Sequence, residues 1–396
     1  MNHELATHSL PRRRFIRLLG GGAVLVAAPL TGCSAAYPAA AVRAWQAPVE
    51  AVSKAADVRS WMLAHALLAP NPHNRQPWIA DVRRSGEITL VCDAERLLPQ
   101  TDPFGRQILI GCGAFVELAV MAAAERGHRV QVNLFPDGEP GPRELPGGRA
   151  VARLVVEPDA SLPRDPLFEQ IRRRRTHKEA YDNARAIPAA LLQSLQTTAV
   201  ERGLQAGTIT ATPALAALRT ITRDAFETEI LTPRTYLESA RLMRIGPTEI
   251  EQHRDGIPLM GIAARLMSAV GAFDRYEVPQ RGSSNYRQVM DRWSVFETGS
   301  GYFWIASHVN SRTAQLDSGR AYVRAQLQAT AAGVDMHPLS QAIQEYPEVS
   351  PQFDALRVML SIDDATTTVQ MLARIGYGKV EAGPSPRREI AQLLRA

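Results

Sequence analysis

The chain has 396 residues, of which 45% are hydrophobic and 21% charged, and this ordinary globular composition excludes disorder as its main state. Its formal net charge is +5, but residues 1–33 carry four arginines and one glutamate, so the remainder carries only +2. A remainder this close to neutral has no overall positive field to hold a nucleic acid, so no nucleic-acid partner is expected.

Residues 1–33 have the features of an export signal. Arg12-Arg13-Arg14 precedes an uncharged stretch of 13 residues, 18–30, which is too short to span a bilayer because a span needs about 20 residues. The basic cluster resembles a twin-arginine signal, and Leu30-Thr31-Gly32-Cys33 matches a lipobox whose cysteine is acylated. We expect export by the twin-arginine route, followed by lipid anchoring through Cys33 on the periplasmic side of the membrane. A signal that is cleaved without lipidation is the alternative.

The segment that follows the signal is expected to be a tether, and the expected export route favours a bound cofactor. Residues 34–50 are rich in Ala and Pro and are expected to be a tether without a fold. The twin-arginine route carries proteins that are already folded. It therefore favours a cofactor that is loaded and held tightly before export.

The mature chain mixes strands and helices from residue 51 onward. The first elements that we expect are a helix at 51–69, a β-hairpin of Trp78–Val82 and Ile88–Cys92, a helix at Ile108–Glu125, and strands at Arg129–Phe135 and Ala150–Val156. Cys92 and Cys112 are expected to be buried free thiols, although a disulfide would be possible after export. No Cys/His spacing suits a structural zinc site, so no metal is expected.

The second part of the chain repeats this pattern. The further expected elements are helices at Leu167–Arg174, Ala189–Ala199, Pro213–Thr228, Thr235–Met243 and Arg312–Ala332, and strands at Gly301–Val309 and Thr368–Ile375. Residues 250–300 show no clear period, which is typical of a surface loop and less often of a lid. Strands mixed with longer helices indicate an α/β or α+β class.

A first motif, Pro72-His73-Asn74-Arg75-Gln76-Pro77-Trp78, lies between the first helix and the hairpin. It closely resembles an element of the nitroreductase superfamily in which an Asn, then Gln-Pro-Trp, opens the strand after a helix. The family's Asn hydrogen-bonds the polar edge of the FMN ring, so the resemblance assigns Asn74, with Gln76 of the same motif, to cofactor binding. An amide suits this edge because it offers both a donor and an acceptor. The alternative is a loop with a local cap and a packed Trp78.

A second motif, Arg174-Arg175-Thr176-His177-Lys178, is similar to the family's Arg-x-Ser/Thr-x-Arg/Lys stretch. In the family the basic groups contact the phosphate, the ribityl chain and the N1–O2 edge of the flavin. The resemblance therefore assigns Arg174, Arg175, Thr176 and Lys178 to FMN binding. A fixed cation near N1 would stabilise the negative charge of reduced flavin. Without the residues that follow it, an arginine run alone would indicate only a solvated face.

Two further stretches resemble the family. Gly376-Tyr377-Gly378, followed by Arg387 and Arg388, resembles its closing strand and phosphate-binding arginines, and Arg387 is slightly favoured. Ser340 and Gln341 match the positions beside flavin N5, where many relatives carry Glu-Gly. The resemblance thus implies a backbone contact at Ser340 and Gln341 and leaves a side-chain role open.

The order of the motifs, with the Asn74 motif first in a chain about twice the length of simple family members, resembles Acg-type nitroreductase-like proteins. The resemblance implies a nitroreductase-like α/β (α+β) fold of two fused halves, 51–200 and 201–396. These halves would form an internal pseudo-dimer with one FMN site at their junction, in a chain that is a monomer or a homodimer.

The resemblance also implies an FMN-dependent oxidoreductase. It would reduce a small acceptor of the quinone or nitro-compound class, with NAD(P)H or a quinol as donor. No catalytic side chain is assigned, because the flavin carries the chemistry. A flavin-binding or sequestering protein without turnover is the alternative, and a membrane-attached interaction module is a third reading.

Overall fold

The computed structural model describes residues 37–46, 57–261, 274–362 and 364–395. The expected export signal, with its lipobox and Cys33, lies outside the described residues.

The expected tether is partly folded. Within its described portion, the short helix α2 (Ala39–Val42) leads into the 3₁₀ helix η1 (Arg43–Trp45). The side chain of Trp45 is only 5% exposed. The expectation of a segment without a fold is therefore wrong for residues 37–46, because Trp45 anchors them to the body of the protein.

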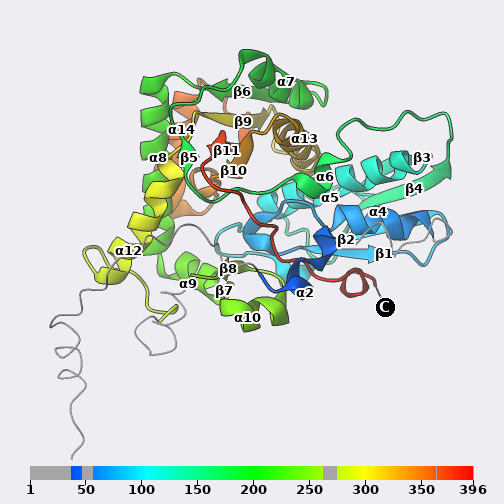
Figure 1. Ribbon diagram of the computed structural model, residues 1–396, viewed down its shortest axis with the longest axis horizontal. Helices are drawn as coiled ribbons and strands as arrows, with labels where there is room; N and C mark the ends of the chain where they lie inside the picture. Colours follow the sequence, from blue (N-terminus) through cyan, green and yellow to red (C-terminus); the bar gives the residue numbers. More distant parts are fainter. Residues whose placement is uncertain (1–36, 47–56, 262–273, 363, 396) are drawn as a thin grey trace, which may run out of the picture. The chain divides into compact units, whose positions relative to one another are not determined.

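A first sheet follows, antiparallel throughout, with the strand order β1-β2-β4-β3 (Figure 1). Its strands are β1 (Trp78–Asp81), β2 (Glu87–Cys92), β3 (His128–Leu134) and β4 (Ala150–Pro158). The hairpin of β1 and β2 is confirmed, with Trp78 opposite Cys92. Both cysteines expected to be free thiols, Cys92 and Cys112, are free and buried.

The helix α5 (Arg106–Glu125) packs on this first sheet, and α4 (Val58–Ala66) packs against α5. Their apolar side chains form one core with the strands, in which Trp78 meets Phe115 at 4.9 Å between ring centroids. Among the described helices, only α5 is long and apolar enough to cross a membrane by length and composition, and 83% of that stretch is buried inside the protein. We therefore interpret α5 as a core helix.

A second antiparallel sheet has the order β10-β11-β9-β6, with β5 paired to the end of β11. Its strands are β5 (Tyr181–Asp182), β6 (Gln205–Ile209), β9 (Gly301–Ser307), β10 (Asp335–Pro338) and β11 (Thr368–Gly378). The two faces of β9 alternate as a strand requires: Phe303 and Ile305 join one apolar cluster, and Tyr302 and Ala306 join another. Both faces of this sheet are therefore covered.

Four helices supply that cover. The first cluster contains residues of α7 and α13, and the second contains residues of α8 and α14. Their bounds are α7 (Ala189–Val200), α8 (Thr212–Leu231), α13 (Arg312–Ala331) and α14 (Ser350–Met359).

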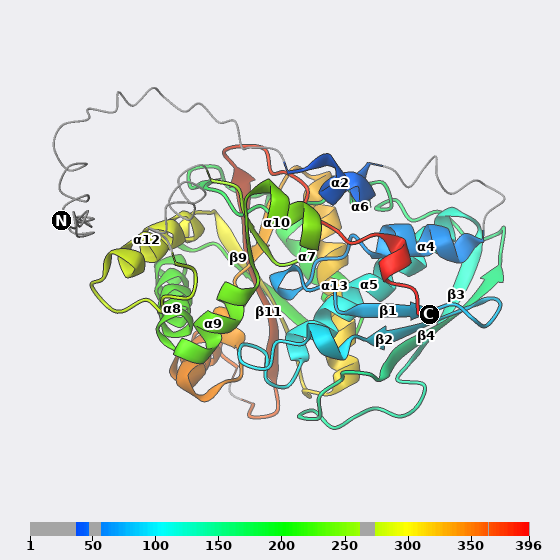
Figure 2. The same ribbon diagram turned by 90° about the horizontal axis from the view of Figure 1, so that it is seen from below.

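The long helices α5 and α13 pack against each other in the region between the two sheets (Figure 2). Their contact is reciprocal. A Cβ on Gly113 would lie 1.9 Å from the carbonyl oxygen of Leu316, and a Cβ on Gly319 would lie 1.9 Å from that of Ile110. Gly113 thus faces the carbonyl of Leu316, three residues before Gly319. Gly319 in turn faces the carbonyl of Ile110, three residues before Gly113. A two-fold relation between two similar halves produces such a contact, as expected for an internal pseudo-dimer.

The division of the chain between the sheets does not coincide with residue 200. The strand β5 and the helix α7, both before that residue, pair or pack with the second sheet. The C-terminal segment returns to the first sheet, where Ala80 N–H donates to Leu393 O at 2.7 Å and Arg395 N–H donates to Ala80 O at 2.9 Å. Figure 1 shows this segment crossing from β11 to the neighbourhood of β1.

Residues 250–300, which show no clear period, include short elements. The strand β8 (Ile257–Leu259) pairs in parallel with β7 (Met243–Ile245), and α12 (Ser284–Trp293) ends in a buried Trp293 stacked on Phe226 at 4.2 Å. Residues 262–273 lie outside the described residues. Short elements of this kind explain why no long period is visible.

The remaining elements are also short. The helices are α6 (Gln170–Arg173), within the longer helix expected at Leu167–Arg174, α9 (Pro233–Arg241) and α10 (Gly246–His253). The 3₁₀ helices are η2 (Pro72–Asn74), η3 (Ala94–Arg96), η4 (Ser294–Glu297), η5 (Gln341–Ile343), η6 (Pro347–Val349) and η7 (Ile390–Gln392).

Candidate functional site

The loop between α4 and β1 has an unusual backbone. His73, Asn74 and Gln76 have φ angles of 47°, 51° and 51°, which non-glycine residues seldom adopt. Such strain persists only where the surroundings fix it, and it clusters at functional sites. Here Gln76 N–H donates to Asn71 Oδ1 at 2.7 Å, and Trp78 is fully buried. The loop therefore also has the local cap and the packed Trp78 that were expected as the alternative to cofactor binding.

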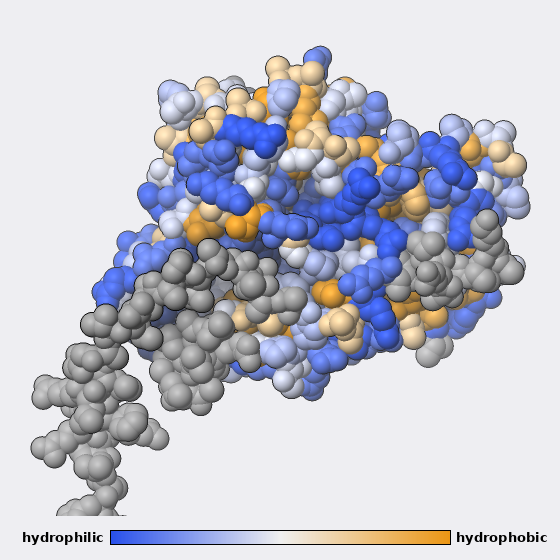
Figure 3. All heavy atoms as spheres, viewed as in Figure 1, coloured by the Kyte–Doolittle hydropathy of each residue, from blue (hydrophilic) through white to orange (hydrophobic). Residues whose placement is uncertain are grey.

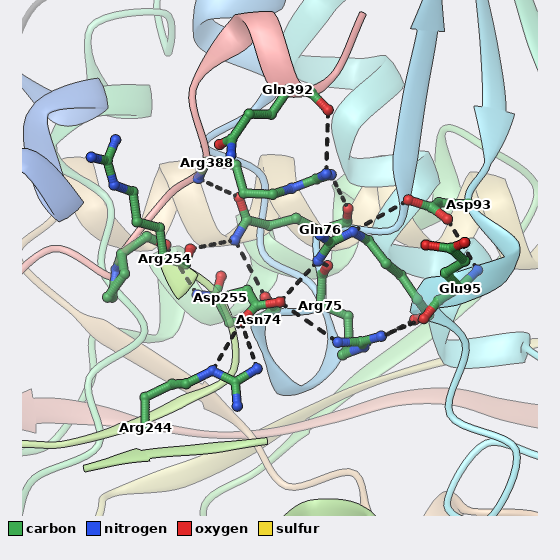
Figure 4. Close-up of polar contacts among 12 residues, drawn as sticks. Asn74, Arg75, Gln76, Asp93, Glu95, Arg244, Arg254, Asp255, Arg388 and Gln392 are labelled. Carbon is green, nitrogen blue, oxygen red and sulfur yellow. Dashed lines mark hydrogen bonds and ion pairs between the residues drawn. The ribbon is translucent and has the colours of Figure 1, made fainter. Parts of the chain in front are cut away.

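This loop is bound directly to the C-terminal segment, more than 300 residues away in sequence. Asn74 Oδ1 accepts a hydrogen bond from the Arg387 guanidinium at 2.6 Å, and Asn74 Nδ2 donates to Pro386 O at 3.0 Å. Gln76 Oε1 accepts from Arg388 N–H at 2.9 Å, while Gln76 Nε2 donates to Arg254 O at 2.8 Å (Figure 4). Gln76 is fully buried, so it positions this segment rather than offering a free group to a ligand.

The adjacent Arg75 lies on the other side of the loop. Its guanidinium is 3.6 Å from the buried carboxylate of Asp255, which also pairs with Arg96 at 2.9 Å and Arg244 at 2.8 Å (Figure 4). Three cations thus compensate one buried carboxylate, and together they fix the loop to the 94–96 and 244–255 segments. These contacts give Arg75 a structural role.

The two arginines of the C-terminal segment point to different places. Arg387 donates to Leu68 O and Ala69 O, both at 3.1 Å, and Arg174 donates to the same Leu68 O at 2.8 Å. Arg388 instead donates to Gln76 O at 2.7 Å. Of the two candidates, only Arg387 therefore shares a hydrogen-bond acceptor with Arg174.

Arg387, Arg174 and Arg175 surround one aromatic ring. Their guanidinium carbons lie 5.3, 5.4 and 4.7 Å from the centroid of the Trp45 ring, within cation–π range. The Trp45 indole N–H donates to Ser385 O at 2.7 Å, which holds the ring in place. Residues 37–46 therefore cover a group of three arginines, two from the second motif and Arg387 from the C-terminal segment.

In the described part of the chain, no carboxylate forms an ion pair with these three arginines, although the charge of Glu381 acts on Arg175. Among the residues that the structure describes, the buried Nε atoms of Arg174 and Arg387 have no hydrogen-bond acceptor. Burial, together with the charges of Arg174 and Arg175, holds the pKa of Arg387 well below its ordinary value. Buried charges are normally paired. A cationic group without a counter-charge is suited to an anionic ligand.

Lys178 connects this group to the Asn74 loop. Thr176 pairs with Met336 of β10, which places the second motif along the second sheet. Water reaches the Lys178 side chain, yet the protein around it, with Arg292 and Arg387, lowers its pKa. The charge of Lys178 in turn contributes to lowering the pKa of His73 to about 4, after burial as the main cause. Lys178 therefore lies near enough to Arg387 and to His73 for its charge to act on both.

Ser340 and Gln341 join the site less directly. The Ser340 carbonyl accepts a hydrogen bond from Gln107 Nε2 at 3.5 Å, and Gln341 lies at the start of η5, beside Glu229. Glu229 is linked through Ser239 to His73. The described contacts therefore connect Gln341 to the Asn74 loop through Glu229 and Ser239, whereas the Ser340 carbonyl contacts Gln107.

Figure 3 shows hydrophilic residues as a band across the middle of the face seen in Figure 1, where the C-terminal segment crosses. A polar surface hollow of about 550 Å³ is lined by Arg173 of α6, Arg175 and His177 of the second motif, Asp335 of β10, and the end of β11 with the segment after it, namely Gly378, Lys379, Val380, Glu381 and Ala382. This hollow lies on the side of Arg175, adjacent to the arginine group.

Sequence reasoning missed three residues of this region. Trp45 is one of two aromatic residues, with Tyr37, in the Ala/Pro-rich stretch 34–50, and this was its only signal. Glu229 occupies a core position of α8, on the buried face that also carries Leu218, Thr222 and Ala225. A carboxylate on that buried face was a sequence signal for a functional group. The sequence gives no such signal for Ser239.

No family model matches the chain. The chain is similar to "Putative NAD(P)H nitroreductase Rv3131" of Mycobacterium tuberculosis strain H37Rv, with 26% identity over 340 residues that cover 84% of this chain and 90% of the relative. It is also similar to "Putative NAD(P)H nitroreductase acg" of that strain, with 38% identity over 72 residues, or 18% of this chain and 22% of the relative. Among solved structures, the FMN-dependent nitroreductase NfnB from Mycobacterium smegmatis in complex with NADPH aligns with a TM-score of 0.36 and 16% identity, covering 58% of this chain and 96% of that one.

Proposed function

Because the chain is a homologue, over 84% of its length, of proteins named as NAD(P)H nitroreductases, we propose that it is an FMN-dependent oxidoreductase of nitroreductase type. NAD(P)H would be the electron donor, and a small quinone or nitro compound would be the acceptor. The observation that carries the proposal is the convergence of Asn74, Lys178 and the uncompensated arginines at one place.

The residues present fit FMN chemically. The phosphate of FMN is a dianion near neutral pH, and Arg174 and Arg387 offer buried Nε–H donors without acceptors. Arg175 and Thr176 follow Arg174 in sequence, and Lys178 supplies a cation of lowered pKa at the accessible side. When bound, FMN supplies hydride transfer, so the chain needs no nucleophile or metal of its own.

The side chains would then bind and orient. Arg174 and Arg387 would hold the phosphoryl end, and Lys178 would favour the negative charge that develops on reduction. Asn74 is occupied by Arg387 and Pro386 O, so its role is to fix Arg387 and the C-terminal segment, and a contact of its own to the ring requires an exchange of partners. Gln76 and Arg388 would support the loop from behind.

Anaerobic spectroscopy of the FMN-reconstituted protein tests the proposal. NADH or NADPH is expected to bleach the flavin absorbance, and adding a benzoquinone or a nitroaromatic compound is expected to restore it. A bound flavin that neither nicotinamide reduces would favour the sequestering protein instead. A protein that binds no FMN would refute both.

Substituting Trp45 with alanine is expected to accelerate FMN dissociation. The indole lies over three guanidinium groups, and each cation–π contact is worth about 0.5–1 kcal/mol, so losing the equivalent of one such contact is expected to accelerate dissociation about 2- to 5-fold. Recovery of FMN fluorescence after dilution measures the rate. Trp45→Phe, which keeps an aromatic ring, is the control, and its FMN dissociation rate should lie between those of the wild type and Trp45→Ala. Equal rates for wild type and Trp45→Ala would show that the ring does not seal the site.

We also propose that the protein is exported by the twin-arginine route and is lipid-anchored through Cys33 at the periplasmic face. The basic cluster, the short apolar stretch and the lipobox support this. Membrane fractionation tests it: the wild type is expected in the membrane fraction with an acylated Cys33, and Cys33→Ser in the soluble exported fraction. Equal fractionation of the two would contradict the anchor.

A further inference from the structure

A buried carboxylate lies behind the Asn74 loop. Glu229 of α8 is 4% exposed, and among the described residues it forms no ion pair. Among the described residues, its carboxylate accepts hydrogen bonds from two neutral side chains, Gln344 Nε2 at 3.0 Å and Ser239 Oγ at 3.4 Å, and the neutral Gln341 lies beside it. Burial raises its pKa to about 7, and the nearby carboxylate of Glu238 adds to the rise. Glu229 can therefore gain and lose a proton near neutral pH.

This carboxylate is connected to the proposed cofactor site. The hydroxyl of Ser239 also lies 3.0 Å from His73 Nε2. His73, Ser239 and Glu229 come from three separate elements, η2, α9 and α8, and form one hydrogen-bonded row from the strained loop to the interior. His73 is partly accessible and precedes Asn74, so the outer end of the row lies at the site.

The charged and titratable groups around the row determine which of its members carries an exchangeable proton near pH 7. Lys178 and Arg75 face His73, and with burial they hold its pKa at about 4, so its imidazole is neutral near pH 7. Tyr346 also faces Glu229, and its phenol stays protonated because burial raises its pKa. Glu229 is therefore the group in the row that holds an exchangeable proton near neutrality.

We propose that Glu229, Ser239 and His73 form a proton relay to the acceptor bound at the FMN site. The inference rests on the proposed function, which supplies a hydride from the reduced cofactor. A quinone that receives that hydride, two electrons and one proton, needs one more proton to become a hydroquinone. His73 Nδ1–H gives this proton to the quinone oxygen while Nε2 takes one from the Ser239 hydroxyl. Ser239 takes its replacement from the Glu229 carboxyl. Between turnovers the resulting carboxylate regains a proton from solvent, and His73 returns to its Nδ1–H tautomer by losing the Nε2 proton to solvent and gaining one at Nδ1.

Rapid mixing of the reduced holoenzyme with a benzoquinone at a series of pH values tests the relay. The wild-type rate is expected to fall as the pH rises through about 7, because Glu229 then loses the proton that it donates. Glu229→Gln and Ser239→Ala are expected to be about 100-fold slower, the low end for general acid catalysis, and to lack this fall. Their FMN affinity should be unchanged.

A matched control comes from the same helix. Glu227 lies two residues before Glu229 but pairs with Arg281 at 3.1 Å, away from Ser239. Glu227→Gln is expected to keep the wild-type pH profile. A wild-type profile in Glu229→Gln would overturn the relay while leaving the oxidoreductase proposal intact. A protein that binds no FMN would instead remove both.

A second measurement needs no cofactor. Since the pKa of Glu229 is raised in the folded protein, its contribution to stability is fully present below its unfolded pKa, near 4.5, and is lost as the pH rises through about 7. Melting temperatures of the flavin-free wild type are therefore expected to fall across this window relative to those of Glu229→Gln. Parallel pH profiles of the two proteins would show that Glu229 holds no proton there and would overturn the relay.

Discussion

Arg387→Ala is expected to weaken FMN binding by about 10- to 100-fold, because a charge-assisted hydrogen bond contributes about 1.5–3 kcal/mol. Arg387 is the candidate that donates to Asn74, to Leu68 O and to Ala69 O, and it shares Leu68 O with Arg174. Its removal therefore takes away a cation and frees the Asn74 amide. Equilibrium titration of FMN fluorescence at fixed ionic strength measures the loss.

Two variants separate this role from a general loss of packing. Arg388→Ala removes an equally buried arginine of the same segment, but one that binds Gln76 O and Trp78 O. It is expected to lower stability more than FMN affinity. Arg387→Lys keeps the charge without the planar fork and should bind FMN with intermediate affinity. Equal loss of affinity in Arg387→Ala and Arg388→Ala would mean that Arg387 is structural.

Gly319→Ala is expected to lower the free energy of unfolding by about 3 kcal/mol, at the upper end of the usual range for overpacking. The added Cβ would lie 1.9 Å from Ile110 O and 2.7 Å from its carbonyl carbon. These are backbone atoms of a helix, so relief requires α5 and α13 to move apart. Urea unfolding followed by circular dichroism measures the change.

The matched control is Gly383→Ala. A Cβ at Gly383 meets nothing within 4 Å, and its backbone is not in the left-handed region. This variant should unfold at the wild-type urea concentration. If Gly319→Ala is as stable as Gly383→Ala, the helix contact is not as close as described, and the case for two reciprocally packed halves loses its main observation.

The long periodic elements could be predicted from the sequence. The hairpin at Trp78, the core helix α5 and the closing strand β11 each show a strong apolar pattern, and each was placed within a few residues. Short elements could not be predicted. Every residue of β6 (Gln205–Ile209) is partly exposed, so no alternation marks it. The strand β10 lies in a stretch to which no element was assigned and ends at Pro338, and its pairing with β11 is a tertiary effect.

The candidate site was predictable where motif residues carry it. Asn74 and Arg387, 313 residues apart, were assigned to one site, and they are hydrogen-bonded at 2.6 Å. Individual roles were not predictable, because they depend on which partner each side chain meets. Gln76 and Arg388 hydrogen-bond to each other and join the Asn74 loop to the C-terminal segment. Trp45 was assigned to the tether, but it covers Arg174, Arg175 and Arg387.

The central claim is that the uncompensated arginine group holds the phosphate of a flavin. Parallel titration of the purified, flavin-free protein with FMN and with riboflavin, which lacks only that phosphate, tests it most directly. The account predicts one FMN per chain, and riboflavin at least about 10-fold weaker, since the charge-assisted phosphate contacts are then missing. Equal affinity for the two flavins, or binding of neither, would contradict it.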